Sequence, residues 1–166
     1  QLCLVSGADL SVIALDLDRP TADFTDRAAM SEEECLAAMQ RGAEAVDPDA
    51  NVLILGEMGI GNSTVAAALS HAAFGGQASD WVGAGTGSSS EGINLKARVV
   101  EKGVILHQDA HGLALLAALG GREQAAICGA VLAARMARIP VLLDGFICTA
   151  ATAPLYADNP VFLDHC

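Results

Sequence analysis

The stretch from Gly56 to Ser63 has the residue types and spacing of a loop that holds phosphate. It reads Gly-Glu-Met-Gly-Ile-Gly-Asn-Ser and matches the pattern G-x-x-x-x-G-K-[ST], except that Asn62 replaces the lysine. Without that lysine the loop lacks the charge that reaches the β and γ phosphates of a triphosphate, whereas main-chain N–H groups at a helix N-terminus still bind one phosphate. We therefore expect a monophosphate ligand rather than ATP, contacted by Met58, Gly59, Ile60, Gly61, Asn62 and Ser63.

A second glycine-rich turn follows Trp81-Val82 and offers further phosphate contacts at Gly83, Gly85, Thr86 and Gly87. Alone it is weak evidence for a dinucleotide site, because the third glycine of G-x-G-x-x-G is absent. Lys96 lies within reach of the same phosphate, although it can equally be a solvated lysine on a helix face. Both turns can also be simple connections into helices, but two turns and a lysine together favour a binding site.

Glu57 is the candidate catalytic residue, because it is the charged residue of the first glycine loop and directly follows an apolar run. A shielded carboxylate there can act as a base or offset positive charge that develops during a reaction. The alternative is a charge that complements the following helix. Asp144, at the end of another predicted strand, either binds a substrate hydroxyl or caps the helix that starts near Phe146.

The remaining chemical signals are weak. His107 and His111 stand four residues apart, but the sequence between them does not reproduce H-E-x-x-H. A further ligand is not evident, so a metal site at these histidines is not favoured. A G-x-S-x-G motif for a nucleophilic serine is also absent from the sequence.

Predicted strands alternate with predicted helices along the chain. Strands are expected at 12–15, 52–55 (covered on both faces) and 140–145, and the strand-turn-helix pattern is expected to repeat around Trp81-Val82. This order predicts a doubly wound α/β fold with a mainly parallel sheet and flanking helices, a Rossmann-like core in a single domain over 1–166. Because ligands bind at the carboxyl ends of parallel strands, Glu57, the turn at 83–87 and Asp144 should converge on one cleft.

Two of the predicted helices have specific features. Ser31 and Glu34 form a capping box, which predicts that a helix starts there. Its apolar stripe is expected at Cys35, Leu36, Met39, Ala43 and Val46. A later helix over 123–138 carries small residues that permit close packing on a neighbour, namely Cys128, Gly129, Ala130, Ala133 and Ala134. Shorter helices are expected over 63–74, 111–119 and 146–153, with one more around Lys96.

Composition narrows the class of protein. The 166 residues are 52% hydrophobic and carry a net charge of −11, which disfavours nucleic acid and anionic membranes as partners. No apolar run approaches the roughly 18 residues of a membrane-spanning helix, and an N-terminal targeting signal is not evident. Five cysteines without a C-x-x-C pair indicate reduced thiols and a cytoplasmic location. The start at Gln1 and the stop at Cys166 suggest a fragment.

The glycine loop at 56–64, the turn at 82–87, Lys96 and the stretch 141–147 together closely resemble the nicotinate-nucleotide:dimethylbenzimidazole phosphoribosyltransferases of cobalamin lower-ligand synthesis. The stretches 18–24 and 29–32 also resemble that family, in the same order. The resemblance implies transfer of the phosphoribosyl group of nicotinate mononucleotide to 5,6-dimethylbenzimidazole, which gives α-ribazole 5′-phosphate and nicotinate. It also implies a homodimer with a parallel α/β core and no metal or cofactor.

By the same resemblance, Glu57 matches the family's active-site glutamate, and Gly59, Gly83, Gly85 and Lys96 match positions around the phosphate. The family is about twice as long and has a second glutamate, its proposed general base, near its C-terminus. We therefore expect residues 1–166 alone to bind phosphate with little or no turnover, and the intact enzyme to be active. The alternatives are a truncated, non-catalytic nucleotide-monophosphate-binding module and, less favoured because of Asn62, a nucleoside triphosphatase.

Overall fold

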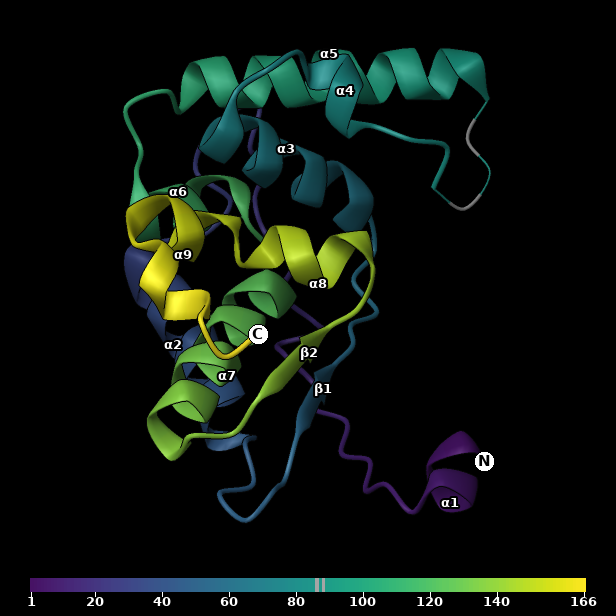
Figure 1. The fold of residues 1–166 in the computed structure, drawn as a ribbon. Helices are drawn as coiled ribbons and strands as arrows, with labels where there is room; N and C mark the ends of the chain where they lie inside the picture. The colour runs from purple at the N-terminus through teal and green to yellow at the C-terminus, as the bar shows by residue number, and fades with distance from the viewer. Residues whose placement is uncertain (86, 88) are drawn as a thin grey trace.

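In the part of the chain that the structure describes, the fold consists of helices and two short strands (Figure 1). A computed structural model describes residues 1–85, 87 and 89–166. Its elements are α1 (Leu2–Ser6), α2 (Glu32–Glu44), β1 (Leu53–Leu55), α3 (Asn62–Phe74), α4 (Ala78–Trp81), α5 (Ser90–Leu106), α6 (Gly112–Leu119), α7 (Arg122–Ala137), β2 (Val141–Leu143), α8 (Gly145–Ala151), α9 (Ala153–Asp158) and the 3-10 helix η1 (Pro160–Leu163).

The two strands form a parallel sheet, which confirms the predicted α/β class. Leu53 pairs with Val141 and Leu55 with Leu143, so the carboxyl ends of both strands lie at the same edge. Two other predicted strands are wrong. The stretch 12–15 is irregular, and Val12 is 84% exposed, so it lacks the packing that would hold a strand. Trp81 belongs to α4, where Gln77 and Asp80 form a capping box that starts a helix instead.

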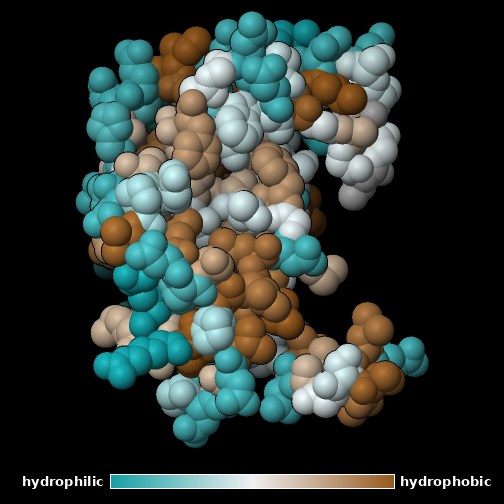
Figure 2. Space-filling model, in the orientation of Figure 1, coloured by the Kyte–Doolittle hydropathy of each residue, from teal (hydrophilic) through white to brown (hydrophobic). Residues whose placement is uncertain are grey.

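One face of the sheet is covered and the other is open. Leu53, Leu55 and Leu143 pack against a cluster of apolar residues from α7 and α8. On the opposite face Ile54 is 62% exposed and Leu142 is 53% exposed, so the expected coverage on both faces is wrong. Apolar side chains gather over the strands on this face (Figure 2). Among the described residues, the sheet has two strands rather than the larger sheet that the sequence predicted.

Helices α2 and α7 approach closely because small residues lie between them. A Cβ atom built on Gly42 would stand 1.8 Å from the carbonyl oxygen of Ala126, and one built on Gly129 would stand 1.8 Å from that of Met39. The close packing predicted for α7 is therefore confirmed. The buried residues of α2 are Cys35, Ala38 and Gly42. Leu36, predicted on the apolar stripe, is 50% exposed, because the small residues rather than the large ones face α7.

The capping box at the start of α2 is confirmed. Ser31 Oγ accepts from the main-chain N–H of Glu34 at 3.1 Å, and the main-chain N–H of Ser31 donates to Glu34 Oε2 at 3.0 Å. The irregular chain before α2 is joined to α6 by two hydrogen bonds, because the N–H groups of Ala29 and Met30 donate to the carbonyls of Ala118 and Ala117.

At the N-terminus, α1 stands away from the other helices (Figure 1) and has no buried residue. None of the described helices combines the length and apolar character needed to cross a membrane.

Candidate functional site

The first glycine loop joins β1 to α3 and holds Glu57 in a defined position. Gly61 precedes α3 with φ +79°, a left-handed conformation that glycine adopts without strain. Glu57 Oε2 accepts from the main-chain N–H of Gly59 at 2.9 Å and also from Asn62 Nδ2. The side chain of Asn62, in the lysine position of a phosphate loop, is therefore engaged by the carboxylate of Glu57.

The second glycine loop meets the first one at Lys96. The side chain of Lys96 reaches from α5, and Nζ donates to Ser63 Oγ at 3.2 Å. A Cβ atom built on Gly85 would lie 3.2 Å from Lys96 Nζ and 3.5 Å from Ser63 Oγ. Lys96 has no ion-pair partner in the part of the chain that the structure describes. One cation, one hydroxyl and the N-terminus of a 13-residue helix thus converge, and such a group attracts an anion.

At the other positions predicted to contact phosphate, only main-chain groups are available for such a contact. Met58 and Ile60 are fully exposed, at 98% and 105%, so their side chains point to solvent. Gly87 closes the second turn by donating its N–H to the carbonyl of Ala84 at 3.1 Å, and Gly83 is exposed beside it. Thr86 lies outside the described residues.

Asp144 and Glu57 follow neighbouring strands, as their pairing in the sheet requires. Asp144 stands at the N-cap of α8, but its side chain makes no capping hydrogen bond there, which leaves its carboxylate exposed. Cys148 belongs to α8, and its Sγ donates to the carbonyl of Leu55, the last residue of β1, at 3.5 Å. Burial, helped by the charges of Glu57 and Asp144, raises the pKa of the Cys148 thiol. Cys148 thus packs against the end of β1, the strand that Glu57 follows.

Sequence reasoning missed Glu123, on the first turn of α7. Its carboxylate lies against the first glycine loop, since a Cβ atom built on Gly59 would be 2.1 Å from Glu123 Oε1. An acidic residue in the first turn of a helix is common because it complements the helix dipole. No local signal therefore indicates that this one contacts a loop much earlier in the chain.

The two histidines do not form a metal site. His107 follows the end of α5 and its Nε2 is 2.9 Å from the carbonyl oxygen of Phe24. His111 precedes α6, so the two rings do not share a helix face. No group of three potential metal ligands occurs within residues 1–85, 87 and 89–166.

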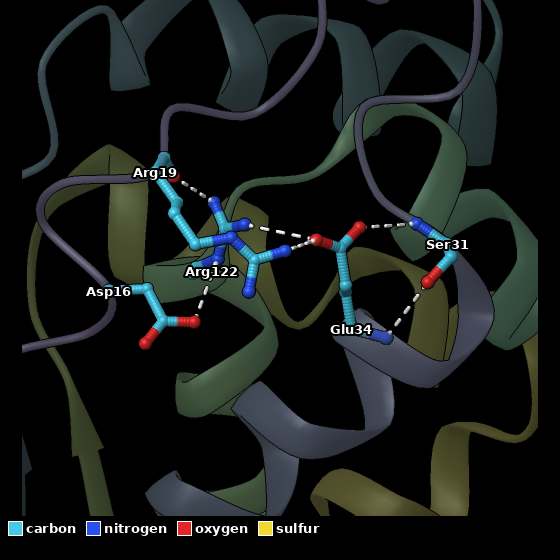
Figure 3. A network of polar contacts seen from close by, with 5 residues as sticks. All are labelled: Asp16, Arg19, Ser31, Glu34 and Arg122. Carbon is cyan, nitrogen blue, oxygen red and sulfur yellow. Dashed lines mark hydrogen bonds and ion pairs between the residues drawn. The ribbon is translucent and has the colours of Figure 1, made fainter.

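A hollow of about 660 Å³ lies on another part of the molecule, between the irregular segment at 14–19 and α2. Its wall includes Arg122, which is joined to Asp16, Arg19 and Glu34 in a polar network (Figure 3). The hollow does not include residues of either glycine loop. The convergence at Lys96 is therefore separate from this hollow.

Comparison with known proteins assigns this arrangement to a family. The model of the DBI_PRT phosphoribosyltransferase family matches residues 1–166. The chain belongs to this family. Two curated relatives bear the name nicotinate-nucleotide--dimethylbenzimidazole phosphoribosyltransferase. The one from Rhodobacter capsulatus is 61% identical over all of this chain and 50% of its own length, and the one from Ruegeria pomeroyi is 58% identical over 99% and 49%.

A solved structure supports the same assignment. The crystal structure of CobT from Thermus thermophilus superposes with a TM-score of 0.80 at 37% identity, over 87% of this chain and 45% of that one. The chain thus spans about half the length of the family members it matches. The predicted family and the predicted parallel α/β fold are confirmed.

Proposed function

We propose that the protein transfers the phosphoribosyl group of nicotinate mononucleotide to 5,6-dimethylbenzimidazole, giving α-ribazole 5′-phosphate and nicotinate. The observation that carries this proposal is the meeting of Lys96, Ser63 and Gly85 beside the loop of Glu57. The names of the relatives favour the same donor and acceptor. The proposal concerns the natural full-length protein, because residues 1–166 span about half the length of these relatives.

In the proposed reaction, Lys96 and the main-chain N–H groups at the start of α3 hold the 5′-phosphate. The bond between C1′ and the nicotinate nitrogen breaks, and its electron pair leaves with nicotinate. A nitrogen of the incoming base bonds to C1′ from the opposite face, and the ring N–H of that base loses its proton to water. That direction of attack inverts C1′ from β to α. Glu57 offsets the positive charge that develops on the ribose, and Asp144 contacts the substrate. In this scheme the two glycine loops also contact the nucleotide, through Met58, Gly59, Ile60, Gly61, Asn62, Gly83, Thr86 and Gly87.

The direct test is to incubate the natural full-length protein with both substrates and to separate the products by chromatography. The proposal predicts equal amounts of α-ribazole 5′-phosphate and nicotinate. Nucleotide binding without either product would instead support a non-catalytic nucleotide-binding module. We also propose a homodimer that works in the cytoplasm, and light scattering of the purified protein tests the dimer.

A further inference from the structure

Glu123 is a half-buried acidic residue whose carboxylate lies beside Gly59 and Gly121. It lies in the first turn of α7, where any acidic side chain would complement the helix dipole. Within the described residues it takes part in no ion pair. Charged groups that are partly removed from water usually have a partner. The acceptor capacity of this carboxylate is therefore available to a ligand.

The contact between Glu123 and Gly59 places this carboxylate at the candidate site. A Cβ atom built on Gly59 would lie 2.1 Å from Glu123 Oε1 and 2.6 Å from Cδ. The carboxylate therefore fills the space that a side chain at position 59 would need. The N–H of the same glycine donates to Glu57 Oε2. Gly59 thus has the carboxylates of Glu57 and Glu123 as immediate neighbours.

The residues on either side of Glu123 hold the first turn of α7 in place. Arg122 donates to the carbonyl of Arg19 at 2.7 Å and to Glu34 Oε1 at 3.3 Å, and its side chain is only 10% exposed. Figure 3 shows this guanidinium between Asp16 and Glu34. Gln124 is fully buried, and its Oε1 accepts from the N–H of Gly121 at 2.9 Å. These contacts fix the backbone that carries Glu123 toward the glycine loop.

The site therefore has two ends of opposite charge. Lys96 and Ser63 lie at one end and suit a phosphate. Glu57 and Glu123 lie around Gly59 at the other, and ionised carboxylates only accept hydrogen bonds. Ribose hydroxyls are donors that acidic side chains bind in other nucleotide sites. We propose that Glu123 accepts hydrogen bonds from the vicinal 2′- and 3′-hydroxyls of the ribose whose phosphate Lys96 holds. This inference rests on the proposed function, since it needs a ribonucleotide in the site.

The test measures the dissociation constants of nicotinate mononucleotide and its 2′,3′-dideoxy analogue by calorimetry, on the natural full-length protein. The wild type should bind the ribonucleotide at least about tenfold more tightly than the analogue, because the analogue lacks both hydroxyls that donate to the charged Glu123. Glu123→Gln should bind both with nearly equal affinity. Glu32→Gln is the matched control, because Glu32 is an exposed acid in the first turn of α2, and it should keep the preference.

A second variant separates ligand binding from a role in helix stability. Glu123→Asp keeps the charge at the N-terminus of α7 and hence its effect on the dipole, but shortens the side chain by one methylene group. It should melt like the wild type and still lose the preference for the ribonucleotide. If both Glu123 variants fold and keep the tenfold preference, the inference is wrong and the proposed function stands. If the wild type binds no nicotinate mononucleotide, both are wrong.

Discussion

The positive charge beside the first glycine loop comes from outside that loop. Asn62 stands where a phosphate loop has lysine, but it binds Glu57. The cation comes instead from Lys96, which lies 33 residues beyond the Ser63 it contacts. In the proposed anion site, the charge that a lysine at position 62 would supply is therefore supplied by Lys96.

Replacing Lys96 should chiefly weaken phosphate binding. Lys96→Ala removes a charge-assisted contact of about 1.5–3 kcal/mol, so the dissociation constant of nicotinate mononucleotide should rise about tenfold to hundredfold. Calorimetric titration measures it. Lys102→Ala is the control, because that lysine is on the same helix and contacts Thr25 instead. Unchanged affinity in the Lys96 variant would remove this residue from the site.

Replacing Glu57 should affect the reaction more than binding. Glu57→Gln keeps an oxygen that can accept from Gly59 but removes the negative charge. We expect kcat of the natural full-length protein to fall about 10²- to 10⁴-fold, with a much smaller change in nucleotide affinity. Glu101→Gln, an exposed change on α5, is the control. A variant with normal kcat would show that the carboxylate has no part in the chemistry.

Sequence reasoning predicted Glu57 and Gly85 from the two glycine-rich turns and Lys96 from its position after the second turn, and the structure brings Lys96 and Gly85 together at Ser63. It missed Glu123 because the contact with Gly59 depends on how α7 packs, and the helix start alone carries no such information.

At the scale of elements, α2 and α7 pack so closely that even an added methyl group between them should disturb the fold. Glycine at 42 and 129 lets each backbone touch the other helix. Gly129→Ala should therefore destabilise the fold by about 1–3 kcal/mol, the usual cost of overpacking. Urea unfolding measures this loss.

Gly56→Ala is the matched control for that change, because nothing lies within 4 Å of the added Cβ atom. It should leave stability nearly unchanged. Equal stability of the wild type and the Gly129 variant would mean that the two helices are farther apart than the structure has them.

Stability should also depend on pH, because the thiol of Cys35 on α2 is buried. Burial, with a smaller contribution from Glu32, raises the pKa of the Cys35 thiol from 9.0 to about 11. The folded state thus keeps the proton at pH values where the unfolded chain loses it. The stabilisation is complete below pH 9 and is lost as the pH rises toward about 11.

Urea unfolding of the reduced protein between about pH 8 and pH 11 tests this effect. The free energy of unfolding should fall more steeply with pH in the wild type than in Cys35→Ala. Identical slopes would show that Cys35 is not shielded at the interface.

Most of the helices could be predicted from the sequence because their ends carry local signals. Ser31 and Glu34 mark the start of α2, and Gly75 ends α3. The stretch 12–15 was predicted as a strand from its apolar residues alone. Whether such a run forms a strand depends on a neighbouring strand edge, which is a long-range property that the run itself does not encode.

At the scale of the whole molecule, the open face of the sheet is the main departure from the predicted fold. Alternating strands and helices correctly predicted the parallel arrangement, but not that Ile54 and Leu142 are exposed. The chain matches about half the length of its relatives.

The central claim is that the two glycine loops and Lys96 bind one phosphate while Glu57 faces the sugar. A crystal structure with nicotinate mononucleotide tests it most directly. We predict the phosphorus atom between the N-terminus of α3 and Lys96 Nζ, with C1′ on the side of Glu57. A nucleotide bound in the hollow between residues 14–19 and α2, or with its phosphate away from Lys96, would contradict the account.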